Sequence, residues 1–128
     1  MGYGKAVQDE LREPAAHLRA AIPAVYEGFA QLHAAALAAG ALDEKTKELL
    51  ALVISISKGC DGCAAAHARG AALKGATSEE VAEAIGVAIL MDGGPATVYG
   101  PRAYSAFQEF HDRRPGHRPV AESTHRHS

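Results

Sequence analysis

Hydrophobic residues recur along this chain at the three- and four-residue spacing that places side chains on one face of a helix. Two stretches show the pattern most fully, with four positions each. These positions are Leu49, Leu50, Val53 and Ile56 in the first stretch, and Val81, Ile85, Ala88 and Ile89 in the second. No stretch alternates apolar and polar residues in the manner of a half-buried strand. The fold class is therefore predicted to be all-α.

Proline and glycine indicate where the first helices begin and end. A short helix is expected over residues 4–12, ended by Pro14 and followed by a turn-rich stretch to Ala21. Pro23 fits the start of a second helix that runs to about Ala39. Its apolar positions, again at helical spacing, are Val25, Phe29, Leu32 and Ala36.

Capping residues delimit the two helices in the middle of the chain. Asp43 is a suitable N-cap for a helix over residues 46–57, which is expected to stop at Gly59. Cys60 then opens a helix that closes at Lys74 and Gly75, because a cation in the last turn followed by glycine is typical of a helix C-terminus.

The same logic predicts two further helices and a tail. Thr77 and Glu80 have capping-box spacing, which starts the helix carrying the second apolar stripe. Pro95 begins a last helix toward His111, which Gly100-Pro101 is expected to kink or divide. Residues 113–128 are polar and rich in Pro and His, and we predict a C-terminal tail there.

Length and composition narrow the possible functions. A chain of 128 residues fits a single domain, which we place at residues 1–112. The content of 48% hydrophobic and 22% charged residues is ordinary for a soluble protein. A net charge of −2 gives no indication of the excess positive charge with which proteins bind nucleic acid or an anionic membrane. No apolar run is long enough to span a bilayer, and the N-terminal residues lack the layout of a secretory signal. We expect a cytoplasmic protein whose partners include neither nucleic acid nor a membrane.

Both cysteines lie close together, and a histidine follows one turn after the second. On a helix, Cys60, Cys63 and His67 share one face. Cys60 is at the helix start, where unpaired N–H groups stabilise a thiolate, and Cys63 is within disulfide reach of it. His67 could take the proton from Cys63, as in a nucleophile–base pair. Glu48, expected to be partly buried on the preceding helix, is a candidate orienting partner.

Other interpretations of these residues remain open. Cys60, Cys63, His67 and Glu48 have suitable types and number for a zinc site, although the first three extend over about 10 Å of helix axis. The cysteines could also be inert buried thiols. Asp61 is predicted to be an acidic residue in the first turn of its helix, where the helix dipole favours negative charge. His17 and His33 read as surface or packing residues.

The order Glu48-(x11)-Cys60-x-x-Cys63-x-x-x-His67 resembles the signature of the alkylhydroperoxidase D-like branch of the carboxymuconolactone decarboxylase family. The sequence ALKGATSEEVAEAI after it is similar to the family's stretch beyond the site. The resemblance covers roughly residues 40–95, with a looser fit to about residue 111. It implies a single-domain helical bundle that assembles as a homotrimer or homohexamer.

The resemblance also implies an activity and a role for each residue. The chain would be a thiol-dependent peroxidase or disulfide reductase with a role in antioxidant defence. Cys63 would attack a hydroperoxide, His67 and Glu48 would relay the proton, and Cys60 would resolve the sulfenic acid to a disulfide. No bound cofactor is implied; an external dithiol, protein or small molecule, would attack the more exposed sulfur, expected to be that of Cys60. An alternative is a redox-sensing or metal-holding oligomer without turnover.

One position departs from the family's pattern. The well-studied hydroperoxidases carry a second histidine immediately before the second cysteine, where this chain has Gly62. One member of the proton relay is therefore missing. The family's namesake decarboxylases lack the cysteine pair, so decarboxylation is not what these residues indicate.

Overall fold

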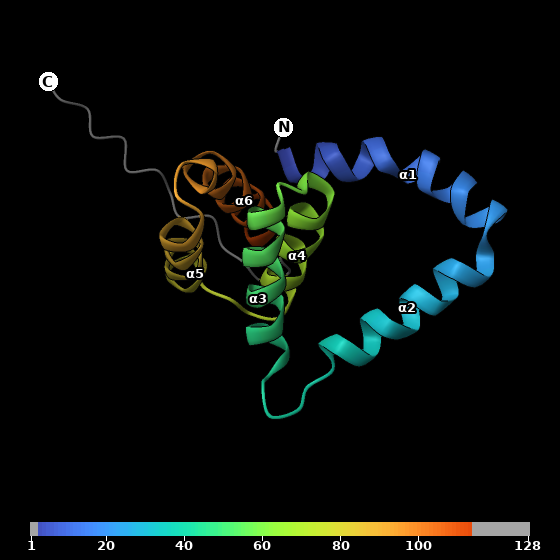
Figure 1. Cartoon of the computed structure of the whole chain (residues 1–128), viewed down its shortest axis with the longest axis horizontal. Helices are drawn as coiled ribbons and strands as arrows, with labels where there is room; N and C mark the ends of the chain where they lie inside the picture. The colour runs from blue at the N-terminus through green and yellow to red at the C-terminus, as the bar shows by residue number, and fades with distance from the viewer. Residues whose placement is uncertain (1–2, 114–128) are drawn as a thin grey trace, which may run out of the picture.

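Six helices make up the described part of the chain (Figure 1). The structure, a computed structural model, describes residues 3–113. The helices are α1 (Tyr3–Ala21), α2 (Pro23–Leu37), α3 (Glu44–Lys58), α4 (Asp61–Leu73), α5 (Ser78–Asp92) and α6 (Gly94–Asp112). No strand occurs within residues 3–113, so the all-α prediction is confirmed. The predicted tail lies, apart from Arg113, outside the described residues.

The core sits between α3, α4, α5 and α6, with α4 packed against α1, α3 and α6. Alanine fills much of α4's contact surface, which lets neighbouring helices approach its backbone closely. Larger side chains from α3, α5 and α6 complete the core, and Leu52, Val81 and Phe107 are fully buried. The buried alanines of α4 are Ala64, Ala65, Ala68, Ala71 and Ala72.

The predicted helix ends are confirmed where a local cap defines them. Asp43 accepts a hydrogen bond from the backbone N–H of Thr46 at 2.7 Å. Thr77 and Glu80 form both hydrogen bonds of the capping box. Gly59 ends α3 with a φ of 62°, in the left-handed region that glycine enters without steric cost.

The prediction that Pro14 ends a helix is wrong, and of the two outcomes predicted at Gly100-Pro101, a kink or a division, the division does not occur. α1 continues through Pro14 to Ala21, and α6 is a single helix with Pro101 inside it. A proline removes one backbone hydrogen bond of its helix, the one that the carbonyl four residues earlier would accept. Those carbonyls belong to Glu10 and Thr97, both exposed residues, so water can hydrate them. The chain breaks instead at Ile22, directly before Pro23.

Two predicted core positions face outward. Val81, Ile85 and Ala88 are buried as expected, whereas Ile89 is 37% exposed and Leu50 is 49% exposed. Both side chains therefore remain partly accessible to solvent in the single chain.

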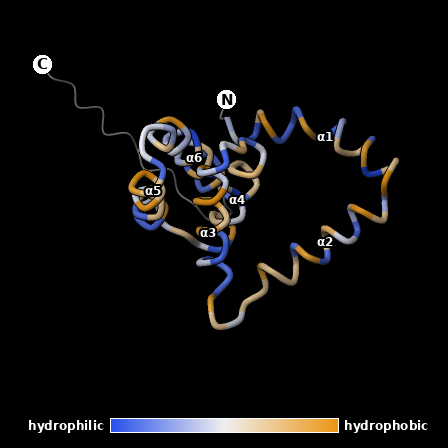
Figure 2. The backbone as a smooth tube through the Cα atoms, viewed as in Figure 1, coloured by the Kyte–Doolittle hydropathy of each residue, from blue (hydrophilic) through white to orange (hydrophobic). Residues whose placement is uncertain are grey.

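The first two helices project from the bundle as an arm (Figure 1). The start of α1 is anchored because Gly4 packs so closely on Phe110 that an added Cβ would lie 2.8 Å from the Phe110 ring. α2 buries no residue, although Figure 2 shows hydrophobic residues along it. Val25, Phe29 and Leu32, on its predicted apolar face, are each more than 60% exposed.

Candidate functional site

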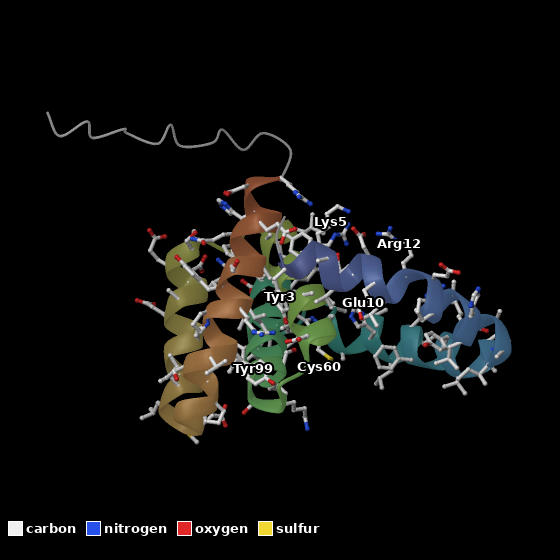
Figure 3. The ribbon with its side chains drawn as sticks, turned by 90° about the horizontal axis from the view of Figure 1, so that it is seen from above. Tyr3, Lys5, Glu10, Arg12, Cys60 and Tyr99 are labelled. Carbon is white, nitrogen blue, oxygen red and sulfur yellow. A yellow bond between two sulfur atoms is a disulfide. The ribbon has the colours of Figure 1, made fainter. Side chains whose placement is uncertain are left out.

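The corner between α3 and α4 places both cysteines at a helix N-terminus. Gly59 turns the chain there, and a Cβ at this position would lie 3.3 Å from the Tyr99 ring of α6. Cys60 follows as the N-cap of α4, as predicted. Figure 3 shows Cys60 at the start of α4, in the same region as Tyr99 and Tyr3. The close approach of Tyr99 therefore ties α6 to the corner that carries the sulfur.

Cys60 and Cys63 form a disulfide, and their Cα atoms are 5.3 Å apart. The backbone N–H of Cys63 points to the Cys60 sulfur at 3.2 Å. Cys63 is exposed and Cys60 is half-buried, which is the reverse of the exposures expected from the sequence. The pair can open and close at one helix turn, and the second cysteine is the more accessible to a partner.

His67 is joined to the preceding helix by a buried carboxylate. His67 Nδ1 lies 2.8 Å from Glu48 Oε2, and Glu48 is only 7% exposed. The expected burial of Glu48 and its pairing with His67 are both confirmed. An ionised carboxylate only accepts hydrogen bonds, so Nδ1 donates to it and Nε2 of the neutral ring remains as the basic nitrogen.

Gly70 makes room for this carboxylate and was not recognised from the sequence. It lies one turn after His67 on α4, and any Cβ at this position would overlap the Glu48 carboxyl group. The sequence does contain a signal, because glycine inside a helix is less stable than alanine and usually has a packing or functional reason. The partner that supplies the reason is on another helix.

His33 of α2 is the second residue that sequence reasoning missed. Its ring stacks on that of His67, with centroids 5.9 Å apart and planes inclined by 15°. His33 and Glu48 line a cavity of about 270 Å³ that Glu44 and Lys74 also border. The prediction of a packing residue holds for His33, but what it packs against is the candidate site. No spacing in the sequence links positions 33 and 67.

Asp61, predicted only as a first-turn acid, belongs to a cluster beside the cysteines. Arg102 Nη1 lies 3.5 Å from Asp61 Oδ2, and the Arg102 guanidinium lies 5.5 Å from the centre of the Tyr3 ring. The Tyr3 hydroxyl and Asp61 Oδ1 are buried, and neither has a well-aligned hydrogen-bond partner within residues 3–113. Burial, and next the Asp61 carboxylate, raise the pKa of Tyr3, and Arg102 opposes the shift. The cluster ties α1 and α6 to the start of α4.

The zinc interpretation gains no support from this geometry. Within the described residues, no three His, Cys, Asp or Glu side chains are grouped closely enough to hold a metal ion. The two sulfurs are bonded to each other, and His67 is hydrogen-bonded to Glu48.

Within residues 3–113, no helix has the length and apolar character that crossing a membrane requires.

Comparison with known proteins accounts for most of the fold. The sequence profile of the carboxymuconolactone decarboxylase family matches residues 23–109, from the start of α2 to near the end of α6. The chain belongs to this family. The family match leaves out α1, which lies before its first residue.

Relatives within the carboxymuconolactone decarboxylase family agree in both sequence and structure. An uncharacterized protein of Cupriavidus necator is 36% identical over 85 residues, which are 66% of this chain and 75% of that protein. Uncharacterized protein 4 in the cox locus of Paracoccus denitrificans is 36% identical over 83 residues, 65% and 75% of the two chains. The crystal structure of an apo family protein from Legionella pneumophila matches with a TM-score of 0.81 and 37% identity, covering 84% of this chain and 96% of that one.

Proposed function

We propose that this protein is a thiol-dependent peroxidase of the alkylhydroperoxidase D-like branch, which reduces hydroperoxides or disulfides with the Cys60–Cys63 pair. The observation that carries the proposal is the disulfide at the N-terminus of α4, one turn from a histidine held by a buried glutamate. Membership of the carboxymuconolactone decarboxylase family supports it.

The first step is attack by the Cys63 thiolate on the distal oxygen of a hydroperoxide. His67, one turn along α4, accepts the thiol proton at Nε2, and the Glu48 carboxylate stabilises the imidazolium that results. The new S–O bond forms as the O–O bond breaks. The departing alkoxide takes the proton from His67 and leaves as an alcohol, so the sulfur is oxidised to a sulfenic acid and the peroxide is reduced.

In the second step Cys60 resolves the sulfenic acid. The Cys60 sulfur attacks the Cys63 sulfur, and the hydroxyl group leaves as water after gaining a proton. The product is the disulfide of the structure. Both cysteines lie within one helical turn, so this step requires little backbone movement.

An external dithiol then restores the thiols by two exchange steps. We place its first attack on the Cys63 sulfur, because Cys63 is the exposed member of the pair. Cys60 departs as a thiolate at the N-cap of α4, where the helix N-terminus and the Cys63 N–H stabilise negative charge. The second thiol of the donor then attacks the donor sulfur that is bonded to Cys63. This releases Cys63 as a thiol and the donor as its own disulfide.

The protein is further proposed to act as a cytoplasmic homotrimer or homohexamer. The support is the apolar face of α2, because Val25, Phe29 and Leu32 are exposed on one side of a helix that has no buried residue within residues 3–113. Such a face is typical of a surface that a partner covers.

Steady-state turnover tests the proposal. The reduced protein is mixed with tert-butyl hydroperoxide and excess dithiothreitol, and peroxide consumption is followed for the wild type, Cys63→Ser and His67→Ala. We expect repeated turnover by the wild type, none by Cys63→Ser and a reduced rate for His67→Ala. Oxidation to the disulfide without turnover would assign a redox sensor instead, and no rapid oxidation would contradict both functions.

A further inference from the structure

A basic groove lies between α1 and α4, outside the Glu48–His67 site. Its volume is about 890 Å³, within the range of small-molecule sites. No acidic residue of the described chain lines it, although the full chain carries a net charge of −2. The cations that line it are Lys5, Arg12, Arg19, Arg69 and Arg113.

These cations are not fully neutralised by neighbouring acids. Lys5 and Arg12 share one carboxylate, that of Asp9. Arg113 pairs with Glu109 at 3.6 Å, and Arg19 lies over the ring of Tyr26. Arg69, on the α4 wall, is exposed and makes no ion pair within residues 3–113. Figure 3 shows Lys5 and Arg12 on one side of α1 and Glu10 on the other. The groove therefore presents positive charge available to an anion.

Apart from Gln8, the lining between the cations is apolar or glycine. Leu11 from α1 and Leu73 from α4 border it, and they are 48% and 54% exposed. Ala66 and Phe110 add further hydrocarbon surface. A ligand that suits both features carries an aliphatic chain and an anionic head group. A purely ionic ligand would leave the leucines in water.

The groove also reaches the residue next to the reactive pair, although neither cysteine lines it. Gly62, the residue directly before Cys63, lines it, and a Cβ at this position would lie 3.1 Å from Leu11 Cδ1. A side chain at position 62 would occupy the space between α1 and α4. Glycine at position 62 therefore lets Leu11 of α1 lie against the backbone directly before Cys63.

We propose that this groove binds an anionic amphiphile, an aliphatic chain with a carboxylate or phosphate head, paired with Arg69 and Arg12. The role in catalysis rests on the proposed function: the amphiphile is then a long-chain hydroperoxide, held with its chain along α1 and α4 near Cys63. α1 supplies one wall of the groove and lies before the residues that the family profile matches.

Binding of an unreactive probe tests the site without any chemistry. Decanoate and uncharged decanol are titrated into the wild type by calorimetry, below the concentrations at which they aggregate. We expect decanoate to bind more tightly than decanol, and Arg69→Gln to weaken decanoate roughly tenfold, since a hydrogen bond to a charged group is lost. Lys45→Gln is the matched control, because it also removes one cation but lies at the Glu80 ion pair, outside the groove.

Competition defines the head-group source and the alternative occupant. Decyl phosphate that displaces decanoate supports the shared anionic chemistry. A short poly-glutamate peptide that binds more tightly than decanoate would overturn the amphiphile in favour of an acidic protein segment. Equal affinity for decanoate and decanol, or an unchanged affinity in Arg69→Gln, would overturn the proposal outright.

Kinetics separate this inference from the proposed function. A fatty-acid hydroperoxide and tert-butyl hydroperoxide are compared as substrates of the wild type and of Arg12→Gln/Arg69→Gln. We expect the double variant to lower kcat/KM for the fatty-acid hydroperoxide at least tenfold more than for tert-butyl hydroperoxide, which has no charged head group to pair with either arginine. Decanoate binding without turnover of either peroxide would support the site and contradict the peroxidase. Turnover of tert-butyl hydroperoxide without decanoate binding would do the opposite.

Discussion

His67 Nδ1 lies 2.8 Å from Glu48 Oε2, and this contact joins α4 to α3 beside the disulfide. Glu48 is one of two polar or charged residues among the buried side chains of residues 3–113. A buried carboxylate needs a partner, because an unpaired one is costly in a low-dielectric interior. The pair therefore fixes the ring orientation of His67 and leaves Nε2 as the site of proton transfer.

Glu48→Gln should lower peroxidase activity and largely keep the fold. Glutamine has the same shape and can still accept the Nδ1–H hydrogen bond, but it cannot stabilise an imidazolium by charge. We expect kcat/KM for hydroperoxide to fall roughly a hundredfold, as for loss of general base assistance. Glu79→Gln, at an exposed position of α5, is the control that should retain activity. Equal activity of the two variants would remove Glu48 from the mechanism.

Gly70→Ala should destabilise the protein because its methyl group overlaps the Glu48 carboxyl group. Overpacking at such a site costs about 1–3 kcal/mol, measurable as a lower midpoint of urea unfolding under reducing conditions. Gly86→Ala is the matched control: it has no atom within 4 Å of the added Cβ and lies inside α5. Alanine there should stabilise by up to about 1 kcal/mol. Similar shifts in both variants would contradict the packing argument.

Local signals predicted the helix ends, because a cap depends on residues close in sequence. Asp43, Gly59 and the Thr77–Glu80 box could all be found in this way. The continuation of α1 through Pro14 could not be predicted in this way. It depends on whether water reaches the freed carbonyl of Glu10, and therefore on whether that side of α1 is exposed in the folded protein.

The same distinction between local signals and contacts with other helices applies to the candidate site. The spacing of Cys60, Cys63 and His67 is contained within one helix, and Glu48 followed from the expected burial of its position. His33 and Gly70 were missed because their roles come from contacts with other helices. Contacts between different helices produce no periodic pattern in a single sequence.

The Tyr3 cluster predicts how stability depends on pH. The pKa of Tyr3 is raised in the folded protein, mainly by burial, so the folded state holds a proton that the unfolded chain releases above a pH of about 10. The stability from the neutral phenol is thus fully present below that pH and is lost as the pH rises further. Urea unfolding between about pH 8 and about pH 11 should show a smaller decline in Tyr3→Phe than in the wild type. An identical decline would contradict the assignment.

The exposed face of α2 predicts that the protein associates through it. Phe29→Asp and Leu32→Asp each place a charge on this face, where both native side chains are more than 60% exposed in the single chain. Burial of one such apolar side chain is worth about 1.5–3 kcal/mol, so each variant should form smaller species in sedimentation velocity. Gln31→Asp adds the same charge elsewhere on α2 and should retain the wild-type assembly. A monomeric wild type would contradict the prediction.

The central claim, that Cys63 attacks the peroxide and Cys60 resolves it, is tested most directly by trapping the intermediate. Reduced Cys60→Ser and Cys63→Ser are each treated with one equivalent of tert-butyl hydroperoxide, and peptide mass spectrometry locates any added oxygen. The account predicts rapid addition of one oxygen atom at Cys63 in Cys60→Ser, and no rapid oxidation of Cys63→Ser. Rapid oxidation at Cys60 in Cys63→Ser, with Cys63 unreactive in Cys60→Ser, would contradict it.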